Sequence, residues 1–272
     1  MIAERGARAL ERYNAALVKR TLKIVALVVL LLVVAVVALF AITFMGRQSI
    51  TDGFEVGGIR IVADGIVSVA VVPAGQGQVV LIDAGNDNAG QAILAELSRR
   101  QLGPDAVAAI FITHGHPDHT GAIGQFRKAQ VMALEAEVGL IEGREGARGP
   151  LTRLFPVRPT GVKVARTLRD SETVTVGEAQ VRVFAVPGHT AGSAAYLVNG
   201  VLFLGDAADT NDAGELSGSP WIFSDNQAQD RASLVRLAQR LDGERADVKA
   251  LVFAHSGVRT EGLAPLTAFA TK

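Results

Sequence analysis

The stretch Thr113-His114-Gly115-His116-Pro117-Asp118-His119 decides how the rest of the sequence is understood. It places three of the chain's five histidines and one aspartate within six residues, directly after the apolar run 108–112. We expect that run to be a buried strand that ends in a loop. Imidazole and carboxylate groups are the usual nitrogen and oxygen ligands of zinc and related divalent metals. The stretch therefore predicts a metal-binding loop at the end of a strand.

The two remaining histidines and a further carboxylate also follow apolar segments. His189 lies in a Pro-Gly turn after a strand-like segment. His255 follows the strand-like segment 248–253, and Asp206 follows the apolar run 201–205. A single histidine at a strand end is more often structural than a ligand. All five histidines at strand ends, together with this carboxylate, point to one shared site.

The order of these residues resembles that of the metallo-β-lactamase-fold hydrolases, and the resemblance covers about residues 55 to 258. It runs His-x-His-x-Asp-His, then Pro-Gly-His, then Gly-Asp and a late histidine. The resemblance implies two metal ions, one held by His114, His116 and His189, the other by Asp118, His119 and His255, with Asp206 bridging the two. It also implies that Asp118 orients the attacking water.

Asp83 matches the aspartate that the family places at the end of an earlier strand. There the resemblance implies a carboxylate that supports the metal site by orienting a ligand histidine and fixing its tautomer. The alternative is a turn aspartate that precedes Gly85.

The resemblance implies a hydrolase whose two divalent ions activate water. Zn²⁺ is the expected metal, although the same ligands also suit Fe and Mn. The chain has no cysteine and no Gly-x-Ser-x-Gly motif, so no protein nucleophile is evident. β-Lactamases of this fold use a cysteine ligand or lack the bridging aspartate, so β-lactam hydrolysis is not expected. Glyoxalase-like thioesterases share the ligand set but typically add a C-terminal glutathione-binding domain, and only a short segment follows His255 here.

We therefore expect hydrolysis of an ester, thioester or lactone in a small molecule, a lipid or a cell-envelope component. Two alternatives stay open. One is a phosphodiesterase or nuclease, which would need a continuous basic groove, and the other is a non-catalytic metal-binding scaffold. The formal net charge of +0 gives no general attraction for nucleic acid, which is not an expected partner. The oligomeric state is not predicted.

Residues 22–45 carry a single charge, Lys23, and are otherwise almost purely apolar. At 1.5 Å per residue such a helix spans the roughly 30 Å hydrocarbon core of a bilayer. Six basic residues lie before residue 24 and few follow the span, so the positive-inside rule places the N-terminus in the cytoplasm. A cleavable signal peptide is the alternative, but its apolar core would be shorter and end in small residues.

The expected organisation is a cytoplasmic basic segment (1–21), a single transmembrane helix (22–45) and an extracytoplasmic catalytic domain (46–272). Within the first segment, Arg5, Arg8 and Arg12 could share a helix face against anionic headgroups, although a simple topology signal explains them equally well.

Strand and helix patterns alternate through the catalytic domain. Asp64-Gly65 and Asn199-Gly200 predict hairpin turns. Helices are expected over 89–100, 121–128, 135–142, 227–241 and 263–270. Two strand-rich halves that each carry helices match the family's four-layer αββα sandwich, a fold of the α/β (α+β) class.

Two stretches interrupt this pattern. Residues 143–162 are rich in Gly, Pro and Arg, which fits either a solvated loop or a lid that meets an anionic substrate or the membrane surface. Residues 207–226 follow Asp206 and should overhang the metals. In this second stretch, Trp221 and Phe223 either line the substrate pocket or cap the core.

Overall fold

The computed structural model describes residues 2–272, with side chains from Tyr13 onward except that of residue 15. The side chains of Arg5, Arg8 and Arg12, which were expected to share a helix face, lie outside the described residues. The chain divides into two compact units between Met45 and Gly46. The first unit contains one helix, α1 (Ile2–Phe44).

The apolar helix expected from the sequence is present. Residues Ala16–Phe44 of α1 are long and apolar enough to cross a membrane, and none of the most apolar part of this stretch is buried inside the protein. Side chains such as Leu22 and Val37 are both 62% exposed. An apolar surface of this extent needs a partner other than water. A signal sequence has the same properties, so the membrane location stays a prediction.

Two β-sheets form the centre of the second unit, which is described throughout. The first sheet has the strand order β1-β2-β3-β4-β5-β6-β7, antiparallel up to β4 and parallel from β4 to β7. Its strands are Glu55–Val56, Ile59–Asp64, Val67–Gly75, Gln78–Ile82, Val107–Phe111, Gln130–Leu134 and Arg166–Leu168.

The second sheet has the order β15-β14-β11-β10-β9-β8, and β12 and β13 form a separate two-stranded ribbon. The strands β8 to β15 are Thr173–Val176, Ala179–Ala185, Ala194–Val198, Val201–Phe203, Ala208–Thr210, Leu216–Gly218, Ala250–Val252 and Val258–Arg259. The predicted hairpin at Asn199-Gly200 joins β10 to β11, and both turn residues have positive φ (52° and 79°). These are the values that a tight two-residue hairpin turn requires.

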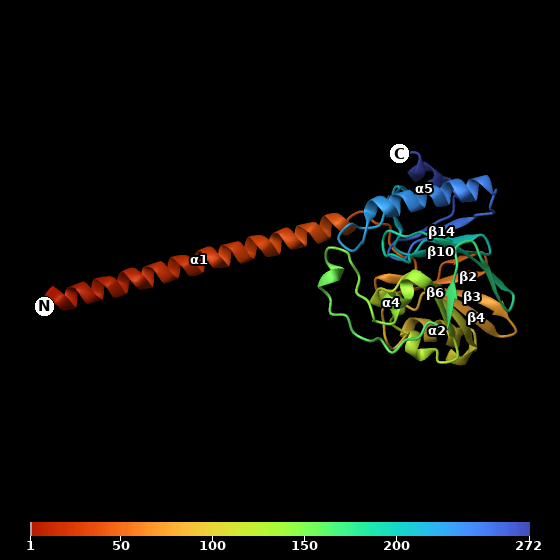
Figure 1. The fold of residues 1–272 in the computed structure, drawn as a ribbon, viewed down its shortest axis with the longest axis horizontal. Helices are drawn as coiled ribbons and strands as arrows, with labels where there is room; N and C mark the ends of the chain where they lie inside the picture. The colour runs from red at the N-terminus through yellow and green to blue at the C-terminus, as the bar shows by residue number, and fades with distance from the viewer. Residues whose placement is uncertain (1) are drawn as a thin grey trace. The chain divides into compact units, whose positions relative to one another are not determined.

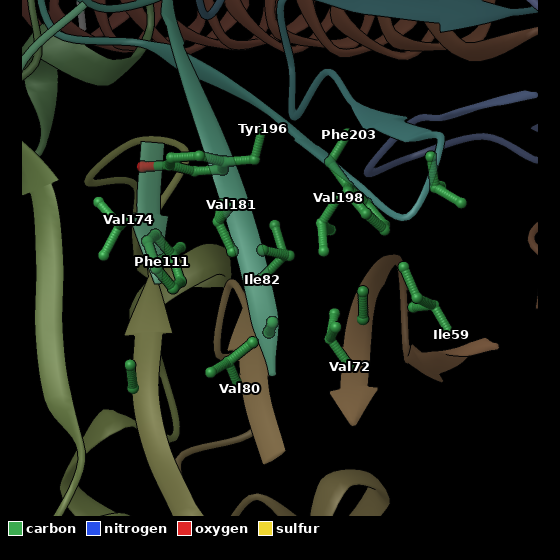
Figure 2. Packing of buried hydrophobic residues seen from close by; sticks show 14 of the residues in the cluster. Ile59, Val72, Val80, Ile82, Phe111, Val174, Val181, Tyr196, Val198 and Phe203 are labelled. Atoms are coloured by element: carbon green, nitrogen blue, oxygen red, sulfur yellow. The ribbon is translucent and has the colours of Figure 1, made fainter. Parts of the chain in front are cut away.

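The two sheets pack face to face, with helices on both outer faces (Figure 1). Between the sheets lies a core of β-branched and aromatic side chains, among them Ile82, Phe111 and Val181 (Figure 2). A second cluster joins the first sheet to α2 (Gln91–Arg99), and a third joins the second sheet to α5 (Gln227–Gly243) and α6 (Ala264–Ala270). The predicted αββα sandwich is therefore confirmed.

One expected helix is wrong. Instead of a helix over 121–128, the chain forms a single turn, α3 (Pro117–Thr120), and then the 3₁₀ turn η2 (Ile123–Gln125). Proline at the first helical position starts the turn within the histidine motif itself. The N–H of Gly121 then donates to the carbonyl of Gly85, 2.8 Å away, so the helix does not continue.

The remaining short elements connect the strands. They are the 3₁₀ turns η1 (Pro104–Ala106), η3 (Glu135–Glu137) and η4 (Thr152–Leu154), and the helical turn α4 (Val138–Ile141). The ribbon of β12 and β13 lies in a stretch that was expected to be irregular.

Tyr196 joins the two sheets beside the histidine motif. It is fully buried on β10, and its hydroxyl donates to the carbonyl of Ile112 at 2.7 Å, two residues before His114. Its ring meets Phe111 edge to face, with 5.5 Å between the ring centroids (Figure 2). Nearby, the N–H of Ala194 donates to the carbonyl of Thr113. The start of the metal loop is thus fixed by the opposite sheet.

We expect Tyr196→Phe to lower the free energy of unfolding by about 1–3 kcal/mol, because the buried carbonyl of Ile112 loses its donor. Thermal and urea unfolding of the full chain in detergent would measure this. Tyr13→Phe is the matched control, because Tyr13 is 65% exposed. Equal stability of the two variants would contradict the proposed link between the sheets.

Candidate metal centre

The structure brings all seven predicted ligands to one place, at the ends of four strands. The motif 114–119 follows β5, His189 follows β9, Asp206 follows β11 and His255 follows β14. The ligand atoms form two groups, in each of which they lie within 4.8 Å of one another. One group contains His114, His116, His189 and Asp206, and the other Asp118, His119 and His255.

The first group is a close triangle of imidazole nitrogens. The Nδ1 atom of His116 lies 3.0 Å from Nε2 of His114 and 3.0 Å from Nε2 of His189, and those two Nε2 atoms are 3.2 Å apart. A tetrahedral metal with metal–nitrogen distances of 2.0–2.1 Å needs ligand nitrogens about 3.3 Å apart. The triangle therefore fits one such ion with only slight expansion.

Asp206 stands between the two groups. Its Oδ2 atom lies 3.5 Å from Nε2 of His189 and 3.2 Å from Nε2 of His255, while its Oδ1 atom lies 3.2 Å from Nε2 of His119. Asp118 completes the second group, with Oδ2 3.2 Å from Nε2 of His255. A carboxylate in this position can bind ions of both groups at once.

Buried atoms without hydrogen bonds support binding of ions at this site. Nε2 of His119 and Oδ1 of Asp206 are both buried and lie 3.2 Å apart, but no hydrogen bond joins them to each other or to another group of the described residues. Buried polar atoms are almost always paired, because leaving them unpaired costs free energy. Ligation of a divalent cation would satisfy both atoms, so the residues present fit the metals that the resemblance implies.

Asp83 contacts the site from behind, as the resemblance implied. Its Oδ2 atom accepts hydrogen bonds from Nδ1 of His119 at 2.8 Å and from the hydroxyl of Thr113 at 2.7 Å, and its Oδ1 atom accepts from the Thr113 N–H at 2.7 Å. With its proton on Nδ1, His119 turns the lone pair of Nε2 toward Asp206.

Three other histidines are oriented in the same way by oxygen atoms on the far side of the ring. Nδ1 of His255 lies 2.7 Å from the carbonyl of Ile66, and Nδ1 of His189 lies 3.1 Å from the hydroxyl of Ser224. Nδ1 of His114 lies 3.2 Å from the hydroxyl of Thr113. Each ring thereby presents Nε2 to the centre, which is how protein partners usually fix metal-binding histidines.

Burial and charge set the protonation of the ligands. Burial lowers the pKa of His116 to about 4 and that of His189 to about 3, because desolvation disfavours the imidazolium. Burial opposes ionisation of Asp118, but the neighbouring histidines lower its pKa to about 2. For His255, burial opposes protonation, but the two carboxylates outweigh it and raise the pKa to about 10. For His119, burial likewise opposes protonation, but the carboxylates of Asp206 and Asp83 raise its pKa well above the ordinary value. The ligand forms therefore dominate near neutral pH except at His119 and His255, which must each release a proton to bind metal.

Glu137 is a residue of the site that the sequence did not indicate. It is 1% exposed, and its Oε1 atom accepts from the N–H of Gly115 at 2.7 Å. Its Oε2 atom accepts from the N–H of Gly192 at 2.8 Å and from the hydroxyl of Thr190 at 2.9 Å. Burial raises its pKa to about 7, although these donors oppose the rise. One carboxylate thus joins the loop of the histidine motif to the loop that carries His189.

The loop 220–225 lies against His189. Besides the Ser224 contact, the N–H of Asp225 donates to the carbonyl of His189 at 2.9 Å. Trp221 is 46% exposed and therefore does not cap the core, whereas its neighbour Ile222 is buried. Phe223 is partly buried. A role of Trp221 and Phe223 in substrate binding stays a prediction.

The chain is similar in sequence to proteins of one known superfamily. The model of the metallo-beta-lactamase superfamily matches residues 62–255. The hydroxyacylglutathione hydrolase of Shewanella sp. (strain ANA-3) is 36% identical over 147 residues, which cover 53% of this chain and 49% of that protein. The enzyme of the same name from Halorhodospira halophila is 31% identical over 156 residues, covering 55% and 51%. The chain spans about half the length of these relatives.

Solved structures share the fold. A subclass B3 metallo-beta-lactamase of Bradyrhizobium japonicum superposes with a TM-score of 0.58 at 22% identity, covering 78% of this chain and 80% of that one. A metallo-beta-lactamase family protein from Thermus thermophilus gives 0.57 at 23% identity, with 79% of each chain covered.

We expect the full chain to bind two divalent ions, and His255→Ala to bind one, because this change removes a ligand of the second group only. Elemental analysis of the protein purified in detergent would count the ions per chain. Asp105→Ala should keep both, because it changes an exposed carboxylate that precedes β5, whereas the ligands follow that strand. Two retained ions in His255→Ala would show that His255 is not a ligand.

We expect Glu137→Gln to weaken metal binding about 10–100-fold, because the amide presents N–H groups to backbone donors and loosens both ligand loops. Competition with a chelator of known affinity would measure this, and unfolding curves would test whether the protein stays folded. Glu135→Gln is the matched control, since Glu135 is exposed two residues away. Unchanged affinity in Glu137→Gln would rule out the proposed positioning role.

Proposed function

The chain belongs to the metallo-beta-lactamase superfamily, and from this premise we propose that it is a membrane-anchored dinuclear hydrolase that cleaves an ester-type bond. The bond would be an ester, a thioester or a lactone. The observation that carries the proposal is the convergence of five histidines and two aspartates into two adjoining groups with Asp206 between them.

The ligands divide between two ions, with Zn²⁺ the expected metal and Fe or Mn also suited to these donors. His114, His116 and His189 would hold one ion, Asp118, His119 and His255 the other, and Asp206 both. When bound, such a pair supplies a water that is deprotonated near neutral pH and positive charge that stabilises a developing oxyanion.

Asp118 is the residue that we assign to orient the attacking water. Its side chain is 23% exposed, against 7% for Asp206, so it is the carboxylate of the site that water reaches most easily. Its low pKa keeps it ionised at neutral pH, and it can therefore accept a hydrogen bond or a proton from water. Asp83 and Glu137 would act through the ligands, by holding His119 and the two ligand loops in place.

The substrate class follows from the relatives and from the chain's own loops. The relatives that share 31–36% identity are named hydrolases of hydroxyacylglutathione, an acyl thioester, which favours attack at a carbonyl carbon. Trp221 and Phe223, on the loop that holds Ser224 against His189, would form an apolar side of the pocket. The substrate would be a small molecule, a lipid or a component of the cell envelope.

The anchor is proposed from the N-terminal helix. Its apolar stretch Ala16–Phe44 has the length and composition to cross a bilayer. Basic residues precede it, so by the positive-inside rule the N-terminus would lie in the cytoplasm and residues 46–272 on the outer side of the membrane.

We expect the full chain in detergent, loaded with Zn²⁺ or Mn²⁺, to hydrolyse carboxyl-type substrates from a panel of thioesters, lactones, carboxyl esters, a β-lactam and bis-aryl phosphodiesters. Turnover should fall more than about 100-fold in His116→Ala, because losing a ligand should cost more than losing a group that orients one. Glu135→Ala, an exposed change in a neighbouring turn, should retain activity.

Other outcomes would redirect the assignment. Turnover of the phosphodiester alone would contradict an ester-type substrate and favour a phosphodiesterase or nuclease. A chain that binds two ions and cleaves nothing on the panel would argue for a non-catalytic scaffold.

A further inference from the structure

The exposed apolar side chains of the second unit lie on three loops that hydrogen bonds connect, directly or through one another, to ligand histidines. Within residues 46–272, all of which are described, the large apolar side chains with high exposure are Ile66, Leu154, Phe155, Val157 and Trp221. We call these five residues the apolar rim. Leu154 is 71% exposed and Ile66 is 66% exposed. Most folded proteins bury large apolar side chains of this kind rather than expose them to water.

Hydrogen bonds connect the loops of the apolar rim to ligand histidines on two sides. The carbonyl of Ile66 accepts from His255, as described above. On the other side, the N–H of Leu151 donates to the carbonyl of Ile222 at 2.9 Å, and the N–H of Arg148 donates to the Asp225 carboxylate at 2.8 Å. The loop of residues 143–162 therefore packs on the loop 220–225, which lies against His189.

The tip of the loop 143–162 combines apolar and basic side chains. It leaves the sandwich after α4 as an extended segment (Figure 1), and residues 153–161 are all exposed. Arg153 and Arg158 flank Leu154, Phe155 and Val157, and neither arginine has a carboxylate partner among the described residues. Residues 151–160 contain no acidic residue at all.

We propose that the apolar rim docks on an anionic lipid bilayer, with the apolar side chains in the interface and the two arginines at the phosphate groups. Apolar residues flanked by cations are the composition that anionic membranes attract. A bilayer is also close at hand, because the proposed membrane helix ends at Phe44 and the second unit begins at Gly46. The inference rests in this respect on the proposed anchor.

Docking would decide which substrates reach the metal centre. The side of the centre at Asp118 and His255 adjoins Ile66, and the side at His189 adjoins the loop of Trp221. With both sides on the lipid surface, the centre would receive an amphiphile whose ester lies near the headgroups. Water-soluble substrates would reach it less often.

The absence of cysteine allows the docking to be tested at single positions. The full chain with Leu154→Cys, labelled with an environment-sensitive fluorophore, would be reconstituted in vesicles of equal parts phosphatidylcholine and phosphatidylglycerol. We expect its emission to shift to the blue and to be quenched by bromine-labelled acyl chains. Val157→Cys should behave in the same way, which guards against a defect of one variant.

Ser98→Cys is the control position. Ser98 is exposed near the end of α2, which connects the end of β4 to the start of the parallel strand β5. It therefore lies at the sheet edge opposite the metal loops, and its label should stay in water. Labels at 154 and 157 that are as accessible to water as the label at 98 would overturn the proposal.

The arginines are tested by charge removal. We expect Arg153→Gln with Arg158→Gln to lower the ratio of docked to undocked protein about 25-fold, since each basic residue near an anionic surface contributes about fivefold. In vesicles of phosphatidylcholine alone, which carry no net charge, the ratio of docked to undocked protein should fall to a similar extent for the unchanged chain. Arg245→Gln with Lys249→Gln removes the same charge beyond the far end of α5 and should change little. An equal loss in both pairs would overturn the role of the rim arginines.

Hydrolysis of a water-soluble ester, measured on the same samples, separates this inference from the proposed function. Turnover with labels 154 and 157 in water would overturn the docking and leave the hydrolase intact. Labels in lipid without turnover on any ester would support the docking and count against the hydrolase.

Discussion

The metal centre depends on the hydrogen bonds behind its ligands. Seven ionisable side chains share a small buried volume, and unsupported groups of this kind would be costly to bury. Asp83, Thr113, Ser224 and the carbonyl of Ile66 each engage a histidine on the side away from the centre. These contacts fix both the ring orientation and the nitrogen that carries the proton, and they make the ligand geometry a property of the folded chain itself.

The sandwich supplies those contacts because its two sheets are joined at the edge where the ligands lie. Tyr196 reaches from the second sheet to Ile112, and the hydroxyl of Ser68 on the first sheet donates to the carbonyl of Phe253, two residues before His255. The loop of the histidine motif and the loop of His255 are therefore each anchored to the sheet opposite their own strand. The core between the sheets and the site at their edge are stabilised by the same packing.

The sandwich could be predicted, and the candidate ligands that lie together in the structure could be named, because the strand patterns and the residues that carry the resemblance are local features of the sequence. Apolar strands are visible as short runs, and a ligand such as His189 or Asp206 directly follows one. The helix expected at 121–128 failed because a tertiary contact of Gly121 with Gly85 competes with helix continuation. Glu137 could not be distinguished from Glu135, since its partners are two backbone N–H groups and the hydroxyl of Thr190, all more than twenty residues away along the chain. The sequence also did not indicate that Leu154 and Phe155 are exposed, because apolar residues in a loop can point either into the core or toward solvent.

The bridge that Glu137 makes between two ligand loops has a consequence for how such a protein can change over evolutionary time. The ligand loops share a buried carboxylate, so a substitution that shifts one of them disturbs the other and is readily lost by selection. The loops at 143–162 and 220–225 meet the centre through a few backbone and side-chain hydrogen bonds, and residues 153–161 and Trp221 are exposed to solvent. Insertions and exchanges at these exposed positions would leave the ligands in place. Substrate preference can therefore drift while the chemistry is conserved, and lineages that share this centre are free to diverge in what they cleave.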